Sequence, residues 1–181
     1  SLFVEKYRPK TIEECILPSR LKDFFQAQID KGEIQNMLLI GGAGTGKTTA
    51  AKALCRQLGI DVLFINASES GGIDTIRTDI RSFASTISFS EGKMKCVILD
   101  ESDYLPASSS QPALRAFIEE FSSNCRFILT ANYANRIIDP IKSRCAVIDF
   151  SMSKEEKTAS VVAFNKRAKL ILEDENIVFD K

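Results

Sequence analysis

The sequence predicts an α/β fold in which a five-stranded parallel sheet is flanked by helices on both faces. The first observation is a set of short apolar runs of strand length, at 37–40, 62–66, 96–99, 126–130 and 146–150. The second is that stretches with helical character separate these runs, so that strands and helices alternate. The third is a glycine-rich loop that joins the first run to a helix. Alternating strands and helices are typical of parallel sheets.

The segments between the strands predict where the helices lie. We expect helices at 20–31, 49–58, 74–85, 110–121 and 153–171. The fourth carries Leu114, Phe117 and Ile118 on one side, which is the pattern of a helix packed against a sheet. The last begins after Ser153, which has Glu156 three residues on and so predicts a capping box.

Composition describes an ordinary globular protein. Of the 181 residues, 44% are hydrophobic and 27% are charged, which is enough apolar material for a real core. Lys+Arg and Asp+Glu both number 24, so a polyanion would have to meet a local basic patch. No apolar run approaches the roughly 20 residues of a membrane span, and no signal peptide is visible. We therefore expect a soluble intracellular protein without a membrane partner.

Cysteine and histidine usage narrows the possible chemistry. The five cysteines are scattered and odd in number, so they indicate neither a zinc site nor a disulfide framework, and we expect small buried apolar side chains. Histidine is absent, which excludes Ser-His triads and the usual general base. Catalysis must therefore use carboxylates, lysine, arginine and a metal ion.

The glycine-rich loop matches the pattern G-x-x-x-x-G-K-S/T, which wraps the phosphates of a nucleotide. It consists of Gly41, Gly42, Ala43, Gly44, Thr45, Gly46, Lys47 and Thr48, and Thr49 follows in the helix. Backbone N–H groups and the positive helix end would face the β- and γ-phosphates. Lys47 would reach these phosphates, and the Thr48 hydroxyl would face Mg²⁺. The sequence therefore predicts a nucleotide-binding site at 41–49.

Two carboxylates follow the third strand. Asp100 and Glu101 lie at the carboxyl end of the run 96–99, the sheet edge at which ligands bind. We expect Asp100 to hold Mg²⁺ through water and Glu101 to polarise a water for attack on the γ-phosphate. A small-molecule kinase would not need this glutamate, so the pair favours a hydrolase. The alternative is a solvated acidic strand end.

Polar side chains end or precede three other strands. Asn132 could bind the attacking water and the γ-phosphate as a sensor, or simply begin an Asx turn. Asn66 could hold Glu101 in an unproductive pose, or have no role beyond its loop. Arg144 would lie on the rim and act as an arginine finger for a neighbouring subunit, although its position is equally consistent with a surface salt bridge.

Several motifs together resemble the clamp-loader ATPases of the AAA+ superfamily. They are 4–9 (VEKYRP), the phosphate loop, the Asp100-Glu101 pair, 130–132 (TAN) and 143–145 (SRC), in this order and spacing. The family includes the small subunits of replication factor C, and stretches such as 11–18 look most similar to the clamp-loader subunit of T-even-type bacteriophages. The resemblance covers nearly all of 1–165 and implies an AAA+ type of P-loop NTPase fold.

The resemblance implies how the chain is organised. Residues 1–150 would be the nucleotide-binding domain, with 1–18 as an N-terminal adenine-binding arm. The arm would line the adenine pocket through Val4, Glu5, Lys6, Tyr7, Arg8 and Ile16. Residues 151–181 would begin a helical lid that continues past residue 181. We therefore expect a truncated piece of a longer protein.

The resemblance also implies roles in coupling and DNA binding. Asn132 becomes the sensor and Arg144 the finger acting in trans. Gln111 and Arg115 would link neighbouring sites. Arg77 and Arg81 would follow the DNA backbone from one face of the helix 74–85, unless that face is merely solvated.

The activity implied by the resemblance is that of a DNA sliding-clamp loader. ATP with Mg²⁺ would drive opening of the sliding clamp and its loading onto primer–template DNA by a hetero-pentamer of clamp-loader subunits, and hydrolysis would release the clamp. Two alternatives remain open, another AAA+ DNA motor and a nucleotide-gated assembly module without turnover. The fragment alone is expected to be inactive, and the location to be the host cytoplasm if the protein is phage-encoded.

Overall fold

The structure is a computed structural model that describes residues 6–86 and 94–176. Its strands are β1 (Met37–Ile40), β2 (Val62–Asn66), β3 (Lys95–Asp100), β4 (Cys125–Ala131) and β5 (Ala146–Asp149). Its helices are α2 (Ser19–Lys31), α3 (Lys47–Leu58), α4 (Ile73–Ser85), α5 (Ser110–Glu120), α6 (Asp139–Lys142) and α7 (Lys154–Asp174), with short 3-10 helices η1 (Ser102–Tyr104) and η2 (Ala134–Arg136).

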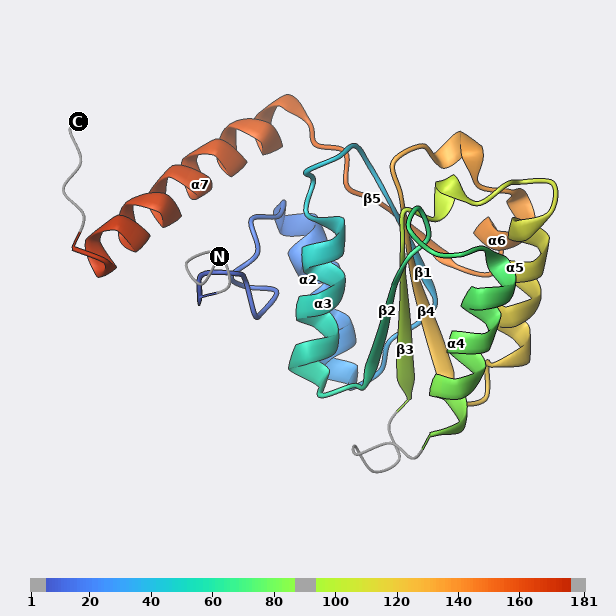
Figure 1. The fold of residues 1–181 in the computed structure, drawn as a ribbon. Helices are drawn as coiled ribbons and strands as arrows, with labels where there is room; N and C mark the ends of the chain where they lie inside the picture. Colours follow the sequence, from blue (N-terminus) through green and yellow to red (C-terminus); the bar gives the residue numbers. More distant parts are fainter. Residues whose placement is uncertain (1–5, 87–93, 177–181) are drawn as a thin grey trace.

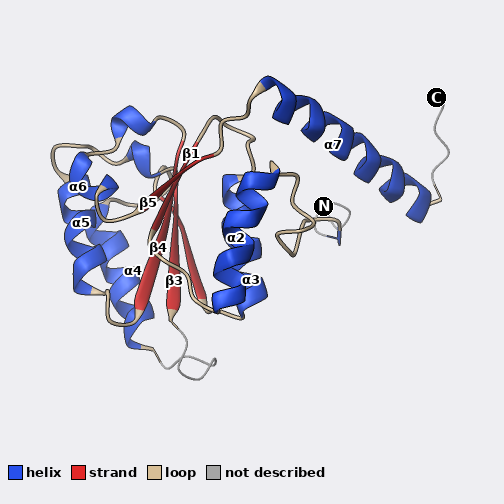
Figure 2. Cartoon of the chain, turned by 180° about the vertical axis from the view of Figure 1, so that it is seen from behind, coloured by secondary structure: helices blue, strands red, loops and turns tan. Residues whose placement is uncertain are grey.

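These strands form one parallel sheet in the order β2-β3-β4-β1-β5. Helices α2 and α3 lie on one face of the sheet, and α4, α5 and α6 lie on the other (Figures 1 and 2). The predicted five-stranded parallel sheet flanked by helices is therefore confirmed. Because β1 lies between β4 and β5, the loop that follows it emerges between the carboxyl ends of these two strands.

Two hydrophobic cores fill the spaces between the layers. Met37 and Leu39 of β1 belong to the core under α2 and α3, whereas Leu38 belongs to the core under α4 and α5. The strand β3 divides in the same way, with Ile98 in the first core and Leu99 in the second. Side chains alternate across a strand, so continuous apolar runs are required where both faces are covered.

The bounds of the predicted elements agree with the structure within one or two residues, except that α7 ends at Asp174, three residues beyond the predicted end, and that three short helices were not predicted. The sequence analysis did not predict η1, η2 or α6, because helices of one turn are too short to show a period. The helix α3 begins at Lys47 rather than at Thr49, so Lys47 and Thr48 of the phosphate loop already belong to its first turn and Gly46 is its N-cap.

Helix α7 has a different environment from the others. The predicted capping box is confirmed, since Glu156 N donates to Ser153 Oγ at 3.1 Å and Ser153 N donates to Glu156 Oε1 at 3.0 Å. None of its residues is buried, and it projects beyond the sheet layers (Figure 1). No helix in the described part of the chain is both long and apolar enough to cross a membrane.

The cysteines behave as small apolar side chains. All of them are free thiols, and all but Cys145 are buried. Burial raises the pKa of the Cys15 thiol to about 11 and also raises that of Cys125. These thiols therefore stay protonated at neutral pH, in keeping with the predicted packing role.

A buried lysine completes the carboxyl end of α4. The Lys95 side chain is only 4% exposed, and its Nζ donates to the Phe83 carbonyl at 2.7 Å, to the Thr86 hydroxyl at 2.8 Å and to the Thr86 carbonyl. The last carbonyls of a helix have no partner within the helix. Lys95 supplies that partner from the neighbouring strand β3 and ties α4 to the sheet.

Replacing this lysine tests its structural role. We expect Lys95→Met to lower the free energy of unfolding by about 1–3 kcal/mol, because the carbonyls lose their donor inside the protein. Urea denaturation followed by circular dichroism measures the change. The exposed Lys154 is the matched control, and Lys154→Met should change stability by less than about 0.5 kcal/mol. Equal stability of the two variants would contradict the role.

Candidate nucleotide-binding site

The phosphate loop follows β1 and contains glycines at positions where a side chain would be strained. Gly41 has φ +151°, and a Cβ there would lie 3.1 Å from Phe150 Cβ and 3.2 Å from Thr45 Oγ1. Gly46, just before α3, has φ +92°. Gly41 N also donates to the Ala131 carbonyl at 3.2 Å, which ties the loop to β4. The backbone therefore takes the shape that the glycine pattern predicted.

The side chain of Lys47 is enclosed by this loop. It is 6% exposed, and its Nζ donates to the Gly41 carbonyl at 2.6 Å and to the Gly42 carbonyl at 2.8 Å. Burial lowers the pKa of Lys47, while the nearby Asp100 and Asp103 carboxylates oppose that shift. A buried ammonium whose acceptors are neutral carbonyls fits an anionic group at the loop, since phosphate oxygens are stronger acceptors for it.

Asp100 connects three elements through one oxygen. Its Oδ1 accepts a hydrogen bond from Thr48 Oγ1 of α3 at 2.7 Å and another from Thr130 Oγ1 of β4 at 2.6 Å. The Thr130 hydroxyl in turn accepts from Glu101 N at 3.0 Å. Two residues far apart in sequence thus place a hydroxyl and a carboxylate side by side, and oxygen ligands of this kind suit Mg²⁺.

Glu101 has an unusual backbone conformation. Its φ of +55° lies in the left-handed region, which costs a non-glycine residue about 1–3 kcal/mol. The chain turns here from β3 into η1, and the partly exposed carboxylate has no hydrogen-bond partner among the described residues. Such strain at the end of a strand is typical of functional positions, and it sets Glu101 apart from Asp100.

Asp103 holds the loop that carries Asn132, a role that the sequence analysis missed. Asp103 is 8% exposed, and its Oδ2 accepts from both Asn132 N and Tyr133 N at 3.1 Å. The carboxylate therefore fixes the backbone at the end of β4. A third carboxylate in the run 100–103 (DESD) could have drawn attention to Asp103, but nothing in the sequence indicated which loop its side chain would contact.

A cavity of about 690 Å³ adjoins the phosphate loop. The predicted residues among those lining it are Ile16, Ala43, Gly44, Thr45, Gly46 and Thr49. Val161 and Phe164 of α7 line it too, and as side chains exposed by 59% and 62% they supply an apolar wall that the sequence analysis did not assign. The cavity thus joins the polar loop to an apolar compartment, as a nucleotide with a base and phosphates requires.

The other described arm residues that were predicted to contact adenine, Lys6, Tyr7 and Arg8, do not line this cavity. Val4 and Glu5 fall outside the described residues. The Lys6 ammonium and the Tyr7 hydroxyl bind Glu175 near the end of α7, and Arg167 donates to the Tyr7 carbonyl at 2.7 Å. Arg8 lines a smaller hollow together with Thr48 and Thr49. Their predicted adenine contacts stay predictions.

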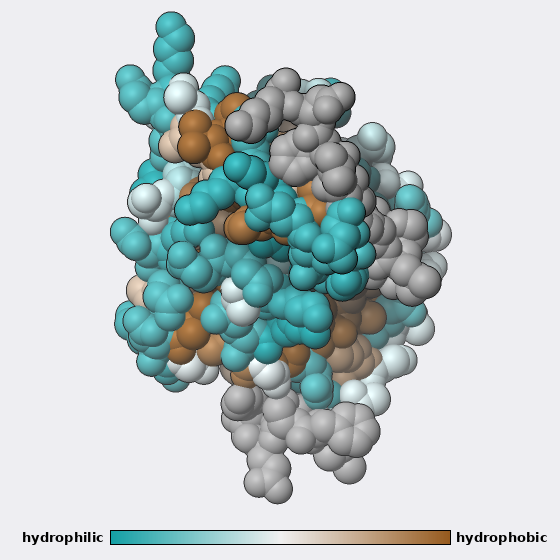
Figure 3. Space-filling model, turned by 90° about the vertical axis from the view of Figure 1, so that its left-hand side faces the viewer, coloured by the Kyte–Doolittle hydropathy of each residue, from teal (hydrophilic) through white to brown (hydrophobic). Residues whose placement is uncertain are grey.

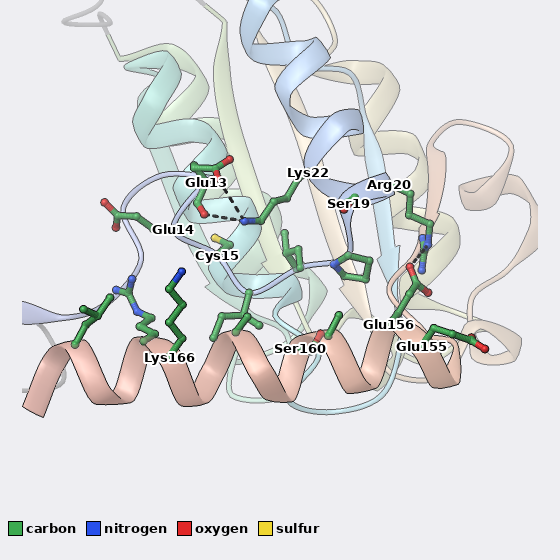
Figure 4. A pocket seen from close by; sticks show the side chains of 17 residues that line it. Glu13, Glu14, Cys15, Ser19, Arg20, Lys22, Glu155, Glu156, Ser160 and Lys166 are labelled. Atoms are coloured by element: carbon green, nitrogen blue, oxygen red, sulfur yellow. Dashed lines mark hydrogen bonds and ion pairs between the residues drawn. The ribbon is translucent and has the colours of Figure 1, made fainter. Parts of the chain in front are cut away.

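A second large hollow, of about 700 Å³, separates the arm and α2 from α7 (Figure 4). Charges of both signs line it. Arg20 forms an ion pair with Glu156 at 3.1 Å and donates to the Asp149 carbonyl at 2.7 Å, while Lys22 donates to the Glu13 carbonyl at 2.8 Å. Arg20 thus joins α2 to the end of β5 and the start of α7, and Lys22 joins α2 to the arm.

The two residues predicted to couple neighbouring sites differ in exposure. Gln111 is fully buried, and its Nε2 donates to the carbonyls of Leu105 and Arg136 while its Oε1 accepts from Ile138 N. The Gln111 side chain is therefore used within its own chain in this structure, and its coupling role stays a prediction. Arg115 is partly exposed and forms an ion pair with Glu119 at 3.7 Å.

Arg144 is held within its own chain. Its Nε and Nη2 both lie 2.5 Å from Glu119 Oε1, and its Nη1 donates to the Pro140 carbonyl at 3.2 Å. Arg144 and Arg115 line one hollow of about 520 Å³ on the α5 and α6 side of the molecule, where Nε of Arg115 has no hydrogen-bond partner among the described residues. The hydrogen bond from Arg144 holds the pKa of Glu119 below its usual range.

The other predicted side chains also have local partners. Arg77 and Arg81 lie on one face of α4, as predicted, and both approach Glu120 of α5, at 3.4 and 3.5 Å. Asn66 Oδ1 accepts from Ser68 N at 2.9 Å and from Ser68 Oγ at 2.7 Å. In this structure that oxygen is therefore used within its own loop, and the switch role of Asn66 stays a prediction.

Comparison with known proteins agrees with this geometry. The family model described as "ATPase family associated with various cellular activities (AAA)" matches residues 37–152. The chain belongs to the AAA family. The match begins at β1 and ends just past β5, so it covers the whole sheet and the phosphate loop.

Curated relatives of this AAA chain include phage and archaeal proteins. It is 43% identical to the sliding-clamp-loader large subunit of Escherichia phage RB69, covering 87% of this chain and 49% of that protein. The corresponding protein of Enterobacteria phage T4 is 45% identical over 84% of this chain and 47% of its own length. The replication factor C small subunit of Haloarcula marismortui is 41% identical over 89% and 50%. The chain thus spans about half the length of these relatives.

A solved structure confirms the fold of the AAA chain. The Holliday junction branch migration motor RuvB of Thermotoga maritima aligns with a TM-score of 0.67 over 92% of this chain and 55% of that one, with 21% sequence identity. At this identity the likeness concerns the fold alone.

The hydrogen bonds of Asp103 can be tested by substitution. We expect Asp103→Leu to lower the free energy of unfolding by about 2–4 kcal/mol, since two backbone N–H groups lose their acceptor. Asp103→Asn keeps one acceptor oxygen and should cost less than half as much. Urea denaturation measures both. A loss below about 0.5 kcal/mol for the leucine variant would show that the carboxylate does not hold this loop.

The contact between Arg144 and Glu119 predicts a pH dependence. The folded pKa of Glu119 is lowered, so its stabilising contact is fully present above the ordinary glutamate pKa and is lost as the pH falls through the lowered value. Carboxyl carbon NMR should show the Glu119 titration shifting to higher pH in Arg144→Gln. Lys142→Gln, which removes a nearby cation, is the control and should leave it unchanged. An unmoved titration in Arg144→Gln would refute the contact.

Proposed function

We propose that this chain is the ATPase portion of a DNA sliding-clamp-loader subunit that binds ATP with Mg²⁺. The observation that most directly supports a nucleotide site is the hydrogen bond from Thr48 Oγ1 to Asp100 Oδ1 at 2.7 Å, beside the enclosed Lys47. The clamp-loader assignment is supported by the 43% and 45% identity to the phage subunits. Membership of an ATPase family supports hydrolysis rather than transfer to a small molecule.

In this proposal different residues of the chain bind the phosphates, hold the metal ion and orient the attacking water. Lys47 would exchange its carbonyl acceptors for the β- and γ-phosphate oxygens. Thr48 and Asp100 would hold Mg²⁺, which neutralises phosphate charge when bound. Glu101 would orient and polarise the attacking water, and Asn132 would contact the γ-phosphate. Ile16, Val161 and Phe164 would enclose the base at the apolar end of the cavity.

Arg144 would act on the nucleotide of a neighbouring subunit. Its guanidinium lies on the α5 and α6 side of the molecule and is bound to Glu119, with a side-chain exposure of 29%. A neighbouring γ-phosphate would compete with Glu119 for it, and an arginine finger can accelerate hydrolysis by about 10³–10⁵. Hydrolysis would then depend on assembly with other clamp-loader subunits.

DNA would be contacted from α4. Arg77 and Arg81 share Glu120, so each guanidinium retains donors for backbone phosphates. Primer–template DNA would compete with Glu120, and affinity would fall steeply with salt. Within this scheme residues 1–150 form the nucleotide-binding domain and 151–181 the beginning of a lid, and the sliding clamp is the second partner. If phage-encoded, the protein would act in the host cytoplasm.

The role of Glu101 gives a direct prediction. Glu101→Gln in the full-length parent should lower ATP hydrolysis by at least about 100-fold, because a general base contributes roughly 10²–10⁴. Nucleotide affinity should stay within about threefold, since Lys47 and the loop are unchanged. Steady-state hydrolysis and a fluorescent-nucleotide titration measure the two quantities, with Glu155→Gln as the control. A variant that keeps more than about a third of its activity would exclude Glu101 as the base.

The function itself is tested by the hydrolysis rate of the full-length parent with and without primer–template DNA and a phage-type sliding clamp. A strong rise only when both are present is the expected result. A rate indifferent to both would indicate a different AAA motor. No hydrolysis under any condition would indicate a nucleotide-gated assembly module.

A further inference from the structure

A hollow of about 520 Å³ beside α3 is lined by positively charged side chains. We call it the basic hollow. The charged residues that line it are Arg8 and Lys10 of the arm and Lys52 and Arg56 of α3. Among the described residues that line it there is no aspartate or glutamate. Four cations therefore surround one concavity in a chain whose Lys+Arg and Asp+Glu counts are equal.

These four cations have no ion-pair partner among residues 6–86 and 94–176. Within the same residues, the Lys52 Nζ lies 4.2 Å from the centre of the Phe64 ring. The hollow in Figure 4 is lined by charges of both signs, with Arg20 paired to Glu156. Ion pairs within the described part of the chain thus do not compensate the repulsion among the four cations, and an anionic ligand would relieve it.

The floor of the basic hollow is apolar. Pro9, Ala53, Ile60 and Val62 line it between the cations, and the Val62 side chain is 39% exposed. Seen from the side on which α3 lies in Figure 1, the surface is mainly hydrophilic with separate hydrophobic patches (Figure 3). A mixture of apolar floor and cationic rim suits a ligand that carries both apolar and acidic side chains.

The lining argues against nucleic acid as the ligand. None of the described residues that line the hollow is aromatic, so they offer no surface on which a base could stack. The strand β2 begins at the border of the hollow with Val62 and lies at the end of the sheet order, so one of its edges faces no other strand of the described residues. An exposed strand edge offers backbone groups to an extended peptide.

We propose that the basic hollow binds an extended acidic segment of a partner protein. Carboxylates of the segment would meet Arg8, Lys10, Lys52 and Arg56, and an apolar side chain between them would cover Ile60 and Val62. Lys52 and Arg8 also line the small hollow beside Thr48 and Thr49, so the segment would lie next to the nucleotide site. This binding does not require hydrolysis.

The test is a fluorescence-anisotropy titration of the 181-residue chain with the labelled acidic peptide EDLEELED. We expect a Kd of about 10–100 μM at low salt, weakening as salt screens the charges. The peptide QNLQQLQN removes the carboxylates and EDSEESED removes the apolar residues. Both should bind at least about fivefold more weakly. Labelled oligo-dT tests single-stranded nucleic acid.

Charge reversal locates the binding site. Lys10→Glu with Arg56→Glu should weaken binding of EDLEELED at least about tenfold. The control is Lys154→Glu with Lys169→Glu, which makes the same charge change on exposed residues of α7 and should stay within about twofold of the original affinity. Circular dichroism confirms that both variants fold, and Lys10→Gln with Arg56→Gln provides a milder pair if the first does not.

Three results would overturn the proposal. The first is a wild-type chain that binds EDLEELED no better than QNLQQLQN. The second is equal weakening by the two charge-reversal pairs, which would indicate a general effect of net charge. The third is oligo-dT bound more tightly than the peptide and lost on reversal of Lys10 and Arg56, which would make the basic hollow a nucleic-acid surface.

Discussion

The structure depends on the carboxylate of Asp100. It ends β3, accepts hydrogen bonds from Thr48 and Thr130, and so joins the phosphate-loop helix to two strands of the sheet. A charged acceptor makes stronger hydrogen bonds than a neutral one, and removing it would leave both hydroxyls to find other partners. The same contacts place Thr48 beside the carboxylate with which it would hold the proposed Mg²⁺, and the Thr130 hydroxyl accepts from Glu101 N, so one network joins the residues proposed for catalysis.

Much of the fold and part of the site could be predicted because their signals are local. The phosphate loop is a contiguous motif whose glycines have the required positive φ, and the apolar runs gave the strands within a residue or two. The contacts of Asp103, Lys95 and Thr130 could not be predicted, because each joins segments whose proximity depends on strand order and register. The place of Val161 and Phe164 in the cavity wall could not be predicted for another reason. Their cavity exists only where α7 and the arm come together.

Charge is distributed unevenly over this electrically neutral chain. On the α4 and α5 side, Glu119 and Glu120 each serve two arginines, so the groups proposed for trans catalysis and DNA binding are already held in place by carboxylates that a phosphate could displace. The four cations of the basic hollow have no such partner in the part of the chain that the structure describes. The first arrangement favours exchange of one anion for another on assembly, and the second favours a partner that supplies the negative charge.

The most direct measurement of the central claim is the Mg²⁺ dependence of nucleotide binding. A fluorescent ATP analogue would be titrated into the chain and into Thr48→Val, each with Mg²⁺ and with EDTA. If Thr48 and Asp100 hold the metal, Mg²⁺ tightens binding to the original chain by at least about tenfold and has little effect on the variant, whose affinity in EDTA is unchanged. Equal tightening of both proteins by Mg²⁺ would contradict the account.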